Sequence, residues 1–148
     1  MDKILTFVVN KETKKLLLLL GSPHDPQYKV SFWYVVTGGK EEQDSSLEDT
    51  VEREVKEETN LNVEESIYLN WIFKYESLGR SCTEYVYISF VDNTQIILNE
   101  ESIEYMWCDI DEFIAKINWY GNKELLRQVI TYGINKEKYI AEEIIEIT

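Results

Sequence analysis

The sequence predicts an α+β domain, in which a mixed β-sheet is flanked by helices as an α/β/α sandwich. Short runs rich in leucine, β-branched and aromatic residues occupy the start and the middle of the chain. Helical patterns lie between and after these runs. The chain has 148 residues, 44% of them hydrophobic, which suits a single domain over residues 1–148 with a packed core.

The first two runs predict a β-hairpin. Ile4–Val9 and Lys15–Leu20 are apolar, and the polar residues Asn10–Thr13 between them form a turn. The leucine run could be helical by periodicity alone. Its short length and the glycine that follows it, Gly21, favour a buried strand.

The next segments are a loop, a strand and a helix. Gly21–Gln27 holds both prolines and predicts a loop, in which His24 is either an exposed residue or a substrate contact. Phe32–Val36 predicts a strand that ends at Gly38-Gly39. The polar stretch after the glycines predicts a helix from about Ser46 to Thr59.

Strand patterns dominate the middle of the chain. Leu61–Tyr75 predicts a long strand with a bend near residues 64–66, and Cys82–Val91 alternates as a half-buried strand does. Ile96–Leu98 is a short apolar run that extends the sheet or stands alone, and Glu104–Cys108 predicts a further short strand.

The last third of the chain predicts helices. One begins at Asp109, where acidic residues in the first turn suit the helix dipole. A second spans Asn122–Tyr132 and is stopped by Gly133. The tail, Lys136–Thr148, has no clear period, and a helix is one reading of it.

Charge excludes several functions. The formal net charge is −13, and the sequence has no basic stripe, so neither nucleic acid nor an anionic membrane surface is an expected partner. An anionic small substrate requires a bridging cation. No run of about 18 apolar residues predicts a membrane span, and the N-terminus does not resemble a signal peptide, so we expect a cytoplasmic protein. Cys82 and Cys108 have no metal or redox spacing and are expected to be free thiols.

One helix concentrates negative charge next to its buried stripe. Residues 38–61 contain nine carboxylates, and Glu54, Glu57 and Glu58 fall on one side of the predicted helix. That side adjoins the stripe Leu47, Val51 and Val55, which repeats every four residues. The repulsion can be relieved by Arg53 or by a hard divalent cation such as Mg²⁺ or Mn²⁺. The plain alternative is a solvated acidic face.

The start of this helix also has a recognisable pattern. Ser45 and Ser46 are both suitable N-caps, and Ser45 with Glu48 matches a capping box.

Residues 39–61 resemble the Nudix box, G-x5-E-x7-R-E-U-x-E-E-x-G-U, in which U is a bulky aliphatic residue. Seven of its nine specified positions agree, and they are Gly39, Arg53, Glu54, Val55, Glu57, Glu58 and Leu61. Ser45 stands where the pattern has its first Glu, and Asn60 stands in place of the last Gly. Asp44 or Glu42 is an acid close enough in sequence to substitute for that Glu.

The resemblance implies a Nudix (MutT-like) hydrolase, which uses Mg²⁺ or Mn²⁺ to cleave a nucleoside di- or triphosphate or a nucleoside diphosphate derivative by water attack on phosphorus. The metal ligands that it implies are the Gly39 carbonyl, Glu54, Glu57 and Glu58. The catalytic residues that it implies are Glu57, Arg53, which orients a glutamate, and Glu104, a general base or extra ligand with Glu84 as the weaker candidate. Lys40 and Arg80 are candidate phosphate contacts.

Two questions stay open at this point. The departure at Ser45 leaves a second interpretation, a catalytically impaired Nudix-fold module that binds a nucleotide without turning it over. The sequence names neither the nucleotide nor the oligomeric state, for which a homodimer is one option.

Overall fold

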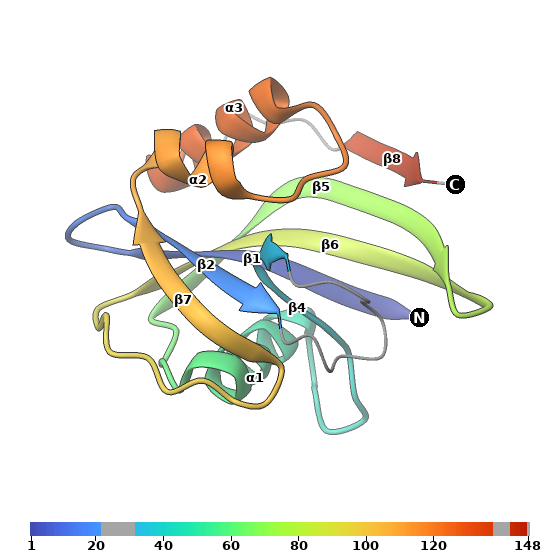
Figure 1. Ribbon diagram of the computed structural model, residues 1–148. Helices are drawn as coiled ribbons and strands as arrows, with labels where there is room; N and C mark the ends of the chain where they lie inside the picture. Colours follow the sequence, from blue (N-terminus) through green and yellow to red (C-terminus); the bar gives the residue numbers. More distant parts are fainter. Residues whose placement is uncertain (22–31, 138–142, 148) are drawn as a thin grey trace.

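In the computed structural model, described over residues 1–21, 32–137 and 143–147, a mixed sheet is covered by helices on both faces (Figure 1). The helices are α1 (Leu47–Thr59), α2 (Ile110–Lys116) and α3 (Lys123–Ile134). The strands are β1 (Asp2–Asn10), β2 (Leu16–Gly21), β3 (Trp33–Tyr34), β4 (Val36–Gly39), β5 (Glu65–Ser77), β6 (Arg80–Val91), β7 (Ser102–Cys108) and β8 (Glu143–Ile147). The predicted α+β sandwich is confirmed.

The sheet has the order β3-β2-β1-β6-β5-β8, with β4 also paired to β1 and β7 also paired to β2. Strands β1 and β6 run parallel, as do β5 and β8, and the other pairs are antiparallel. The predicted hairpin of β1 and β2 forms at Val9 and Leu16. Beyond that pair, β2 departs from β1 to join β7 and β3, so β1 pairs along its length with β4 and β6 instead.

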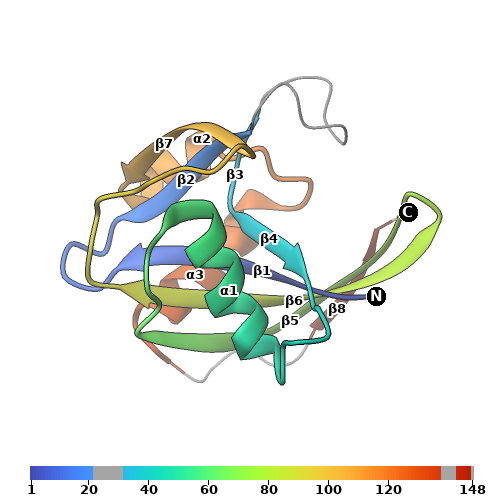
Figure 2. The same cartoon turned by 90° about the horizontal axis from the view of Figure 1, so that it is seen from below.

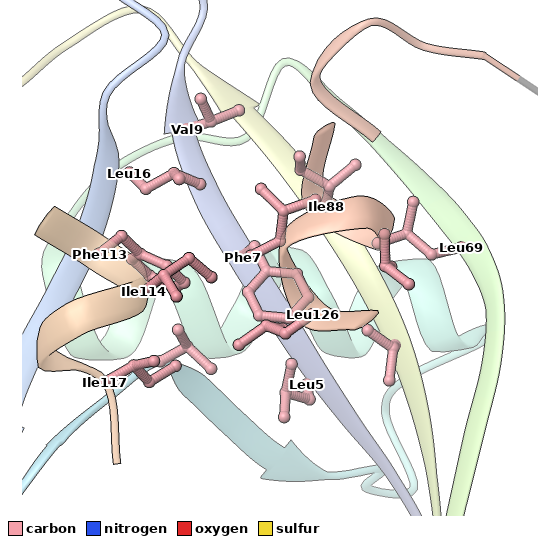
Figure 3. Close-up of a cluster of buried hydrophobic side chains, with 14 of the residues drawn as sticks. Leu5, Phe7, Val9, Leu16, Leu69, Ile88, Phe113, Ile114, Ile117 and Leu126 are labelled. Atoms are coloured by element: carbon pink, nitrogen blue, oxygen red, sulfur yellow. The ribbon is translucent and has the colours of Figure 1, made fainter. Parts of the chain in front are cut away.

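Two hydrophobic clusters lie on opposite faces of the sheet because side chains alternate along each strand. Leu5, Phe7 and Val9 of β1 face α2 and α3, where they meet residues such as Phe113 and Leu126 (Figure 3). Ile4 and Val8 face the other way and pack against Val51 and Val55 of α1. Figure 2 shows α1 lying across β1 and β4 on this second face.

The structure corrects several predicted strands. The run 32–36 is divided into β3 and β4, and the second of these includes both glycines instead of ending before them. The irregularity in β5 falls between Tyr68 and Ile72, where Asn70 has a φ of 53°, and not at residues 64–66. Ile96–Leu98 is extended but forms no strand in the described chain, since Ile97 N–H donates to the Thr59 carbonyl (3.0 Å) at the end of α1.

Capping explains where the helices begin. Ser46 is the N-cap of α1 and its Oγ accepts from Asp49 N–H, while Asp49 Oδ2 accepts from Ser45 N–H. The Ser45–Glu48 capping box is therefore wrong, and Glu48 instead accepts from the hydroxyl of Tyr87. The predicted starts of the other two helices are confirmed, with Asp109 and Asn122 as N-caps.

Gly133 does not stop α3 as predicted. It lies inside the helix, which continues to Ile134, and it is buried against β5 and β6. A Cβ at this position would lie 3.1 Å from Leu69 Cδ2 and 3.2 Å from Ile88 Cδ1. The absence of a side chain lets the helix approach the sheet, which is a long-range constraint that the local pattern does not reveal.

Three other expectations concern the tail, a loop and the cysteines. Residues 143–147 form β8, which extends the sheet beside β5, so the helical reading is wrong for this part of the tail. Apart from Gly21, the predicted loop at 21–27, with His24, lies outside the described residues. Both cysteines are free and buried, as expected.

No helix in the described ranges is long and apolar enough to cross a membrane.

Gly133→Val is expected to lower the free energy of unfolding by about 1–3 kcal/mol, because the added methyls overpack the contact with Leu69 and Ile88. Gln128→Val adds the same side chain at an exposed position of α3 and should cost less than about 0.5 kcal/mol. Thermal unfolding of both variants measures the difference. Equal losses would show that the contact between α3 and the sheet is not tight at Gly133.

Candidate functional site

The motif helix divides its three glutamates between two environments. Val51 and Val55 are fully buried against the sheet, and Glu54 and Glu58 lie beside them with only 8% and 7% of their surface exposed. The side chain of Glu57 is 52% exposed. The helix therefore holds two carboxylates at the sheet and one at the solvent boundary, which confirms that the acidic side adjoins the buried stripe.

Gly38 makes room for Glu54. A Cβ on Gly38 would overlap the carboxyl group of Glu54, so a residue with a side chain cannot stand here unless Glu54 moves. Gly38 pairs with Ile4 of β1, on the face that α1 covers. The first glycine of the pair thus fixes how closely the glutamate approaches the sheet.

Arg53 is the centre of a dense polar network. Its Nη1 donates to Glu54 Oε1 (2.9 Å), and its Nη2 donates to the Gly39 carbonyl (2.9 Å). Weaker contacts of Nη1 reach Glu57 at 3.4 Å and Glu41 at 3.2 Å. The guanidinium thereby links the end of β4 to two of the three motif glutamates.

Asp44 supplies the strongest contacts to Arg53. Its Oδ2 accepts from Arg53 Nη2 (2.8 Å) and its Oδ1 from Nε (3.1 Å), a bidentate pair. Thr50 Oγ1 and Glu41 N–H also donate to Asp44, whose side chain is 3% exposed. The hydrogen bonds from Arg53 hold the pKa of Asp44 well below its ordinary value. Asp44 thus supplies an acid at Arg53 where the motif position itself is Ser45.

Burial makes both Glu54 and Glu58 difficult to ionise. Burial raises the pKa of Glu58 well above its ordinary value, and the charges of Glu101 and Glu54 raise it further. Burial also raises the pKa of Glu54, while hydrogen bonds from Glu58 and Arg53 oppose that rise. Two neighbouring buried carboxyl groups of this kind are costly to ionise together.

The other predicted site residues do not all gather here. Glu104 is exposed on β7, opposite Leu20, and no hydrogen bond or ion pair of the described residues joins it to α1. Lys40 is exposed directly after β4. Arg80 begins β6 in its hairpin with β5, which both views place far from α1 (Figures 1 and 2).

Glu101 is a site residue that sequence reasoning missed. It lies just before β7, and its charge acts on Glu58. Glu100 and Glu101 are adjacent acids, which is a weak indication of a site in the sequence. The local sequence pattern does not show that the connection from β6 to β7 returns to α1. In the structure, the hydrogen bond from Ile97 N–H to the Thr59 carbonyl holds the β6–β7 connection against the end of α1.

The chemistry of the donor set fits a divalent cation. In the described ranges, no three acidic, histidine or cysteine side chains are already arranged as a metal site. One buried carboxylate oxygen, Glu58 Oε2, nevertheless has no hydrogen-bond partner among the described residues. Two buried carboxyl groups that are costly to ionise together, with a third at the surface, are a set that a hard cation stabilises. Glu54, Glu57 and Glu58 are the residues that would hold it.

A large cavity lies on the opposite face of the sheet. Its volume is about 780 Å³, and aromatic residues form part of its wall, with Tyr34, Trp71, Phe73, Tyr75 and Trp119 among them. Lys3 and Thr37 also line it. Lys3 pairs in register with Gly39, so this wall of the cavity begins beside the strand end that Arg53 contacts. A cavity of this size suits a small organic ligand.

Glu58→Gln is expected to stabilise the protein in the presence of a chelator near neutral pH. A raised carboxyl pKa favours folding below about pH 4.5, and this advantage is lost as the pH rises through the folded pKa, where the buried group must ionise. A glutamine side chain does not ionise, so the variant avoids the free-energy cost of a buried charge at neutral pH.

The same variant should lose the response to Mg²⁺. For the unaltered chain, Mg²⁺ at about ten times its Kd should add about 1.4 kcal/mol to the free energy of unfolding. Differential scanning calorimetry with Mg²⁺ and with chelator measures both effects, with the exposed Glu52→Gln as control. A full Mg²⁺ response in Glu58→Gln would remove Glu58 from the ligand set.

Asp44→Asn is expected to cost about 1–3 kcal/mol near neutral pH, because it leaves the Arg53 network without its main acceptor. A lowered pKa contributes stability above the unfolded value of 3.8, and the contribution is lost as the pH falls through the folded pKa. The difference from the unaltered chain should therefore shrink in acid. Urea unfolding across pH tests this, with exposed Asp92→Asn as control. A pH-independent loss would contradict the ionic role of Asp44.

Comparison with known proteins is consistent with this geometry. The sequence matches the NUDIX domain family over residues 2–129, and no curated protein matches it. The fold is similar to a MutT protein from Methanosarcina mazei Go1, with 21% identity, a TM-score of 0.68 and coverage of 94% of this chain and 96% of that chain.

Two other solved structures have a similar fold. The E. coli dihydroneopterin triphosphate pyrophosphohydrolase has 25% identity and a TM-score of 0.61, with coverage of 90% of this chain and 95% of that one. The NUDIX domain of Shewanella oneidensis NrtR, complexed with ADP ribose, has 16% identity and a TM-score of 0.68, with coverage of 88% and 86%. The match over residues 2–129, with Glu54, Glu57, Glu58 and Arg53 on one helix, shows that this chain belongs to the Nudix hydrolase family.

Proposed function

We propose that this protein is a Mg²⁺- or Mn²⁺-dependent pyrophosphohydrolase that cleaves a nucleoside di- or triphosphate, or a nucleoside diphosphate derivative, by water attack on phosphorus. The observation that carries the proposal is the buried Glu54–Glu58 pair, held at the end of β4 by Arg53. A cluster of carboxylates cannot bind a polyphosphate directly, because both are anionic. A bound cation resolves that conflict.

The chain's residues have distinct roles in this proposal. Glu54, Glu57 and Glu58 hold the metal, with the Gly39 carbonyl as a further oxygen. When bound, such an ion neutralises phosphate charge and lowers the pKa of a bound water. Arg53 orients Glu54 and, at longer range, Glu57, so that their oxygens face the same space. Asp44 positions Arg53 in turn.

A carboxylate that accepts the proton of the attacking water is also needed. Glu104 is the residue that the family resemblance proposes. Glu101 is a second candidate, and the effect of its charge on the pKa of Glu58 supports it. The variants Glu101→Gln and Glu104→Gln separate these two assignments, because loss of the residue that accepts the proton should give the larger fall in kcat.

The nucleoside part of the substrate binds in the aromatic cavity in this proposal. The aromatic cavity suits the flat nucleoside part, since aromatic walls stack on planar rings. Lys3 is in register with Gly39, so a ligand in the cavity can extend toward the motif helix around the end of β4. Lys40, directly after β4, is the nearer of the two proposed phosphate contacts, and Arg80 would require a substrate that extends to the β5–β6 hairpin.

The alternative, a nucleotide-binding module without turnover, rested on Ser45. The contact of Asp44 with Arg53 weakens that argument, because an acid still positions the motif arginine. The ADP ribose complex of the Shewanella oneidensis domain is the observation that keeps binding as a second candidate.

Glu57→Gln is expected to lower kcat/KM by at least about 100-fold, since loss of a metal ligand removes several kcal/mol of transition-state stabilisation. Release of phosphate and pyrophosphate from a panel of nucleotides and nucleotide conjugates measures this, with Mg²⁺ and with chelator. Glu52→Gln, exposed on the same helix, is the matched control and should keep full activity. No turnover of any compound, together with thermal stabilisation by one of them, would establish the binding module instead.

A further inference from the structure

Glu84 is a buried carboxylate in the wall of the aromatic cavity, on the face of the sheet away from the motif helix. Its surface is 6% exposed. It lies in register with Phe73 of β5 on one side and with Lys3 of β1 on the other. Two strand spacings, roughly 10 Å in total, separate it from Gly39.

The carboxyl group of Glu84 is only partly satisfied. The hydroxyl of Tyr75 donates to Oε2 (2.8 Å), and Oε1 accepts no hydrogen bond from the described residues. Lys3 influences Glu84 through its charge but does not reach ion-pair distance, and its ammonium lies 5.7 Å from the centre of the Tyr75 ring. Burial raises the pKa of Glu84, whereas the Tyr75 hydroxyl and Lys3 lower it. A buried carboxylate with an open oxygen is stabilised by further hydrogen-bond donors.

The charges around the cavity favour a ligand edge rich in donors. Glu76 and Glu146 also line it, so three carboxylates face one ammonium among the described lining residues. A phosphate group would be repelled here and belongs at the other end, by Gly39. A planar ring that presents N–H groups would be attracted.

Trp71 offers a complementary group. Its indole lines the same cavity, and Nε1 is a buried donor without an acceptor among the described residues. A ring that carries acceptors as well as an edge of donors can satisfy both Trp71 and Glu84. The aromatic residues Tyr34 and Trp119, which stack on each other at 6.1 Å between centroids, also line the cavity and offer surfaces on which a planar ring can stack.

Few heterocycles present two adjacent donors to a carboxylate. Adenine and cytosine each place an amino donor beside a ring acceptor, and the acceptor would face the carboxylate unfavourably. Hypoxanthine and uracil present one ring N–H. The 2-amino-4-oxopyrimidine edge of guanine, which a pterin shares, places a ring N–H next to an amino group, and its oxygen and ring nitrogens remain as acceptors.

We propose that Glu84 is a specificity residue, whose carboxylate accepts two hydrogen bonds from a 2-amino-4-oxopyrimidine edge and so selects a guanine nucleotide or a pterin phosphate as substrate. This inference rests on the proposed function for the site of cleavage, but it concerns ring recognition alone.

Binding of the 5′-monophosphates tests it, because GMP and IMP differ only in the 2-amino group and contain no anhydride bond to cleave. Isothermal titration calorimetry in Mg²⁺ should give a Kd for GMP at least about tenfold lower than for IMP or AMP. Glu84→Gln should bring the GMP and IMP values within about twofold, with the larger loss of affinity for GMP, because GMP donates two hydrogen bonds to Glu84 and IMP donates one. Glu12→Gln, exposed in the turn after β1, is the control and should keep the tenfold preference.

Equal binding of GMP and IMP by the unaltered protein would overturn the proposal, and this comparison does not depend on whether the variant folds. An equal loss of both ligands in a folded Glu84→Gln variant would also overturn it. Turnover of adenine and guanine nucleotides at similar rates would contradict ring selection by Glu84, although it would support the proposed hydrolase activity. The Kd values of guanosine and neopterin, which both lack phosphate, distinguish a guanine substrate from a pterin substrate. The compound that binds more tightly identifies the class.

Discussion

The guanidinium of Arg53 holds together the parts of the molecule that the site requires. It bonds the Gly39 carbonyl at the end of β4, the carboxylate of Glu54 within α1, and Asp44 in the segment between them. Without that cation, two buried glutamates and a buried aspartate would repel one another across a space of low polarity. Gly38 adds the steric condition, because only a residue without a side chain lets Glu54 approach β4. The position of α1 on the sheet therefore depends on the contacts of Arg53 and on the absence of a side chain at Gly38.

The two halves of the proposed site lie on opposite faces of one sheet. The α1 face holds carboxylates for a cation, and the other face holds an aromatic cavity that suits a planar ring. The edge formed by β4 and the start of β1 connects them, since Thr37 and Lys3 line the cavity while Gly38 contacts Glu54. Alternation along β4 explains this, because successive residues of a strand point to opposite faces. In the proposed function, residues 37–39 therefore connect the cavity that would bind the ring to the site that would hold the metal.

Features encoded by local patterns could be predicted from the sequence, and features made by long-range contacts could not. The helix at 46–59 and its acidic side next to a buried stripe both follow from short-range rules, and the structure confirms them. Asp44 could be named only as one of two acids near Ser45, because the side chain that reaches Arg53 depends on the path of the chain between β4 and α1. Gly133 shows the reverse case, in which a residue that usually ends a helix is instead placed within one by its contact with Leu69 and Ile88. Glu101 and the cavity around Glu84 were beyond reach, since each is assembled from strands and connections distant in sequence.

The central claim is that Glu54, Glu57 and Glu58 form a metal site around the Arg53 network. A crystal grown in Mn²⁺ and measured at the manganese absorption edge tests it most directly. We expect anomalous peaks among these three carboxylates, accompanied by an inward turn of Glu57. Peaks confined to other acidic groups, or none at saturating Mn²⁺, would contradict it.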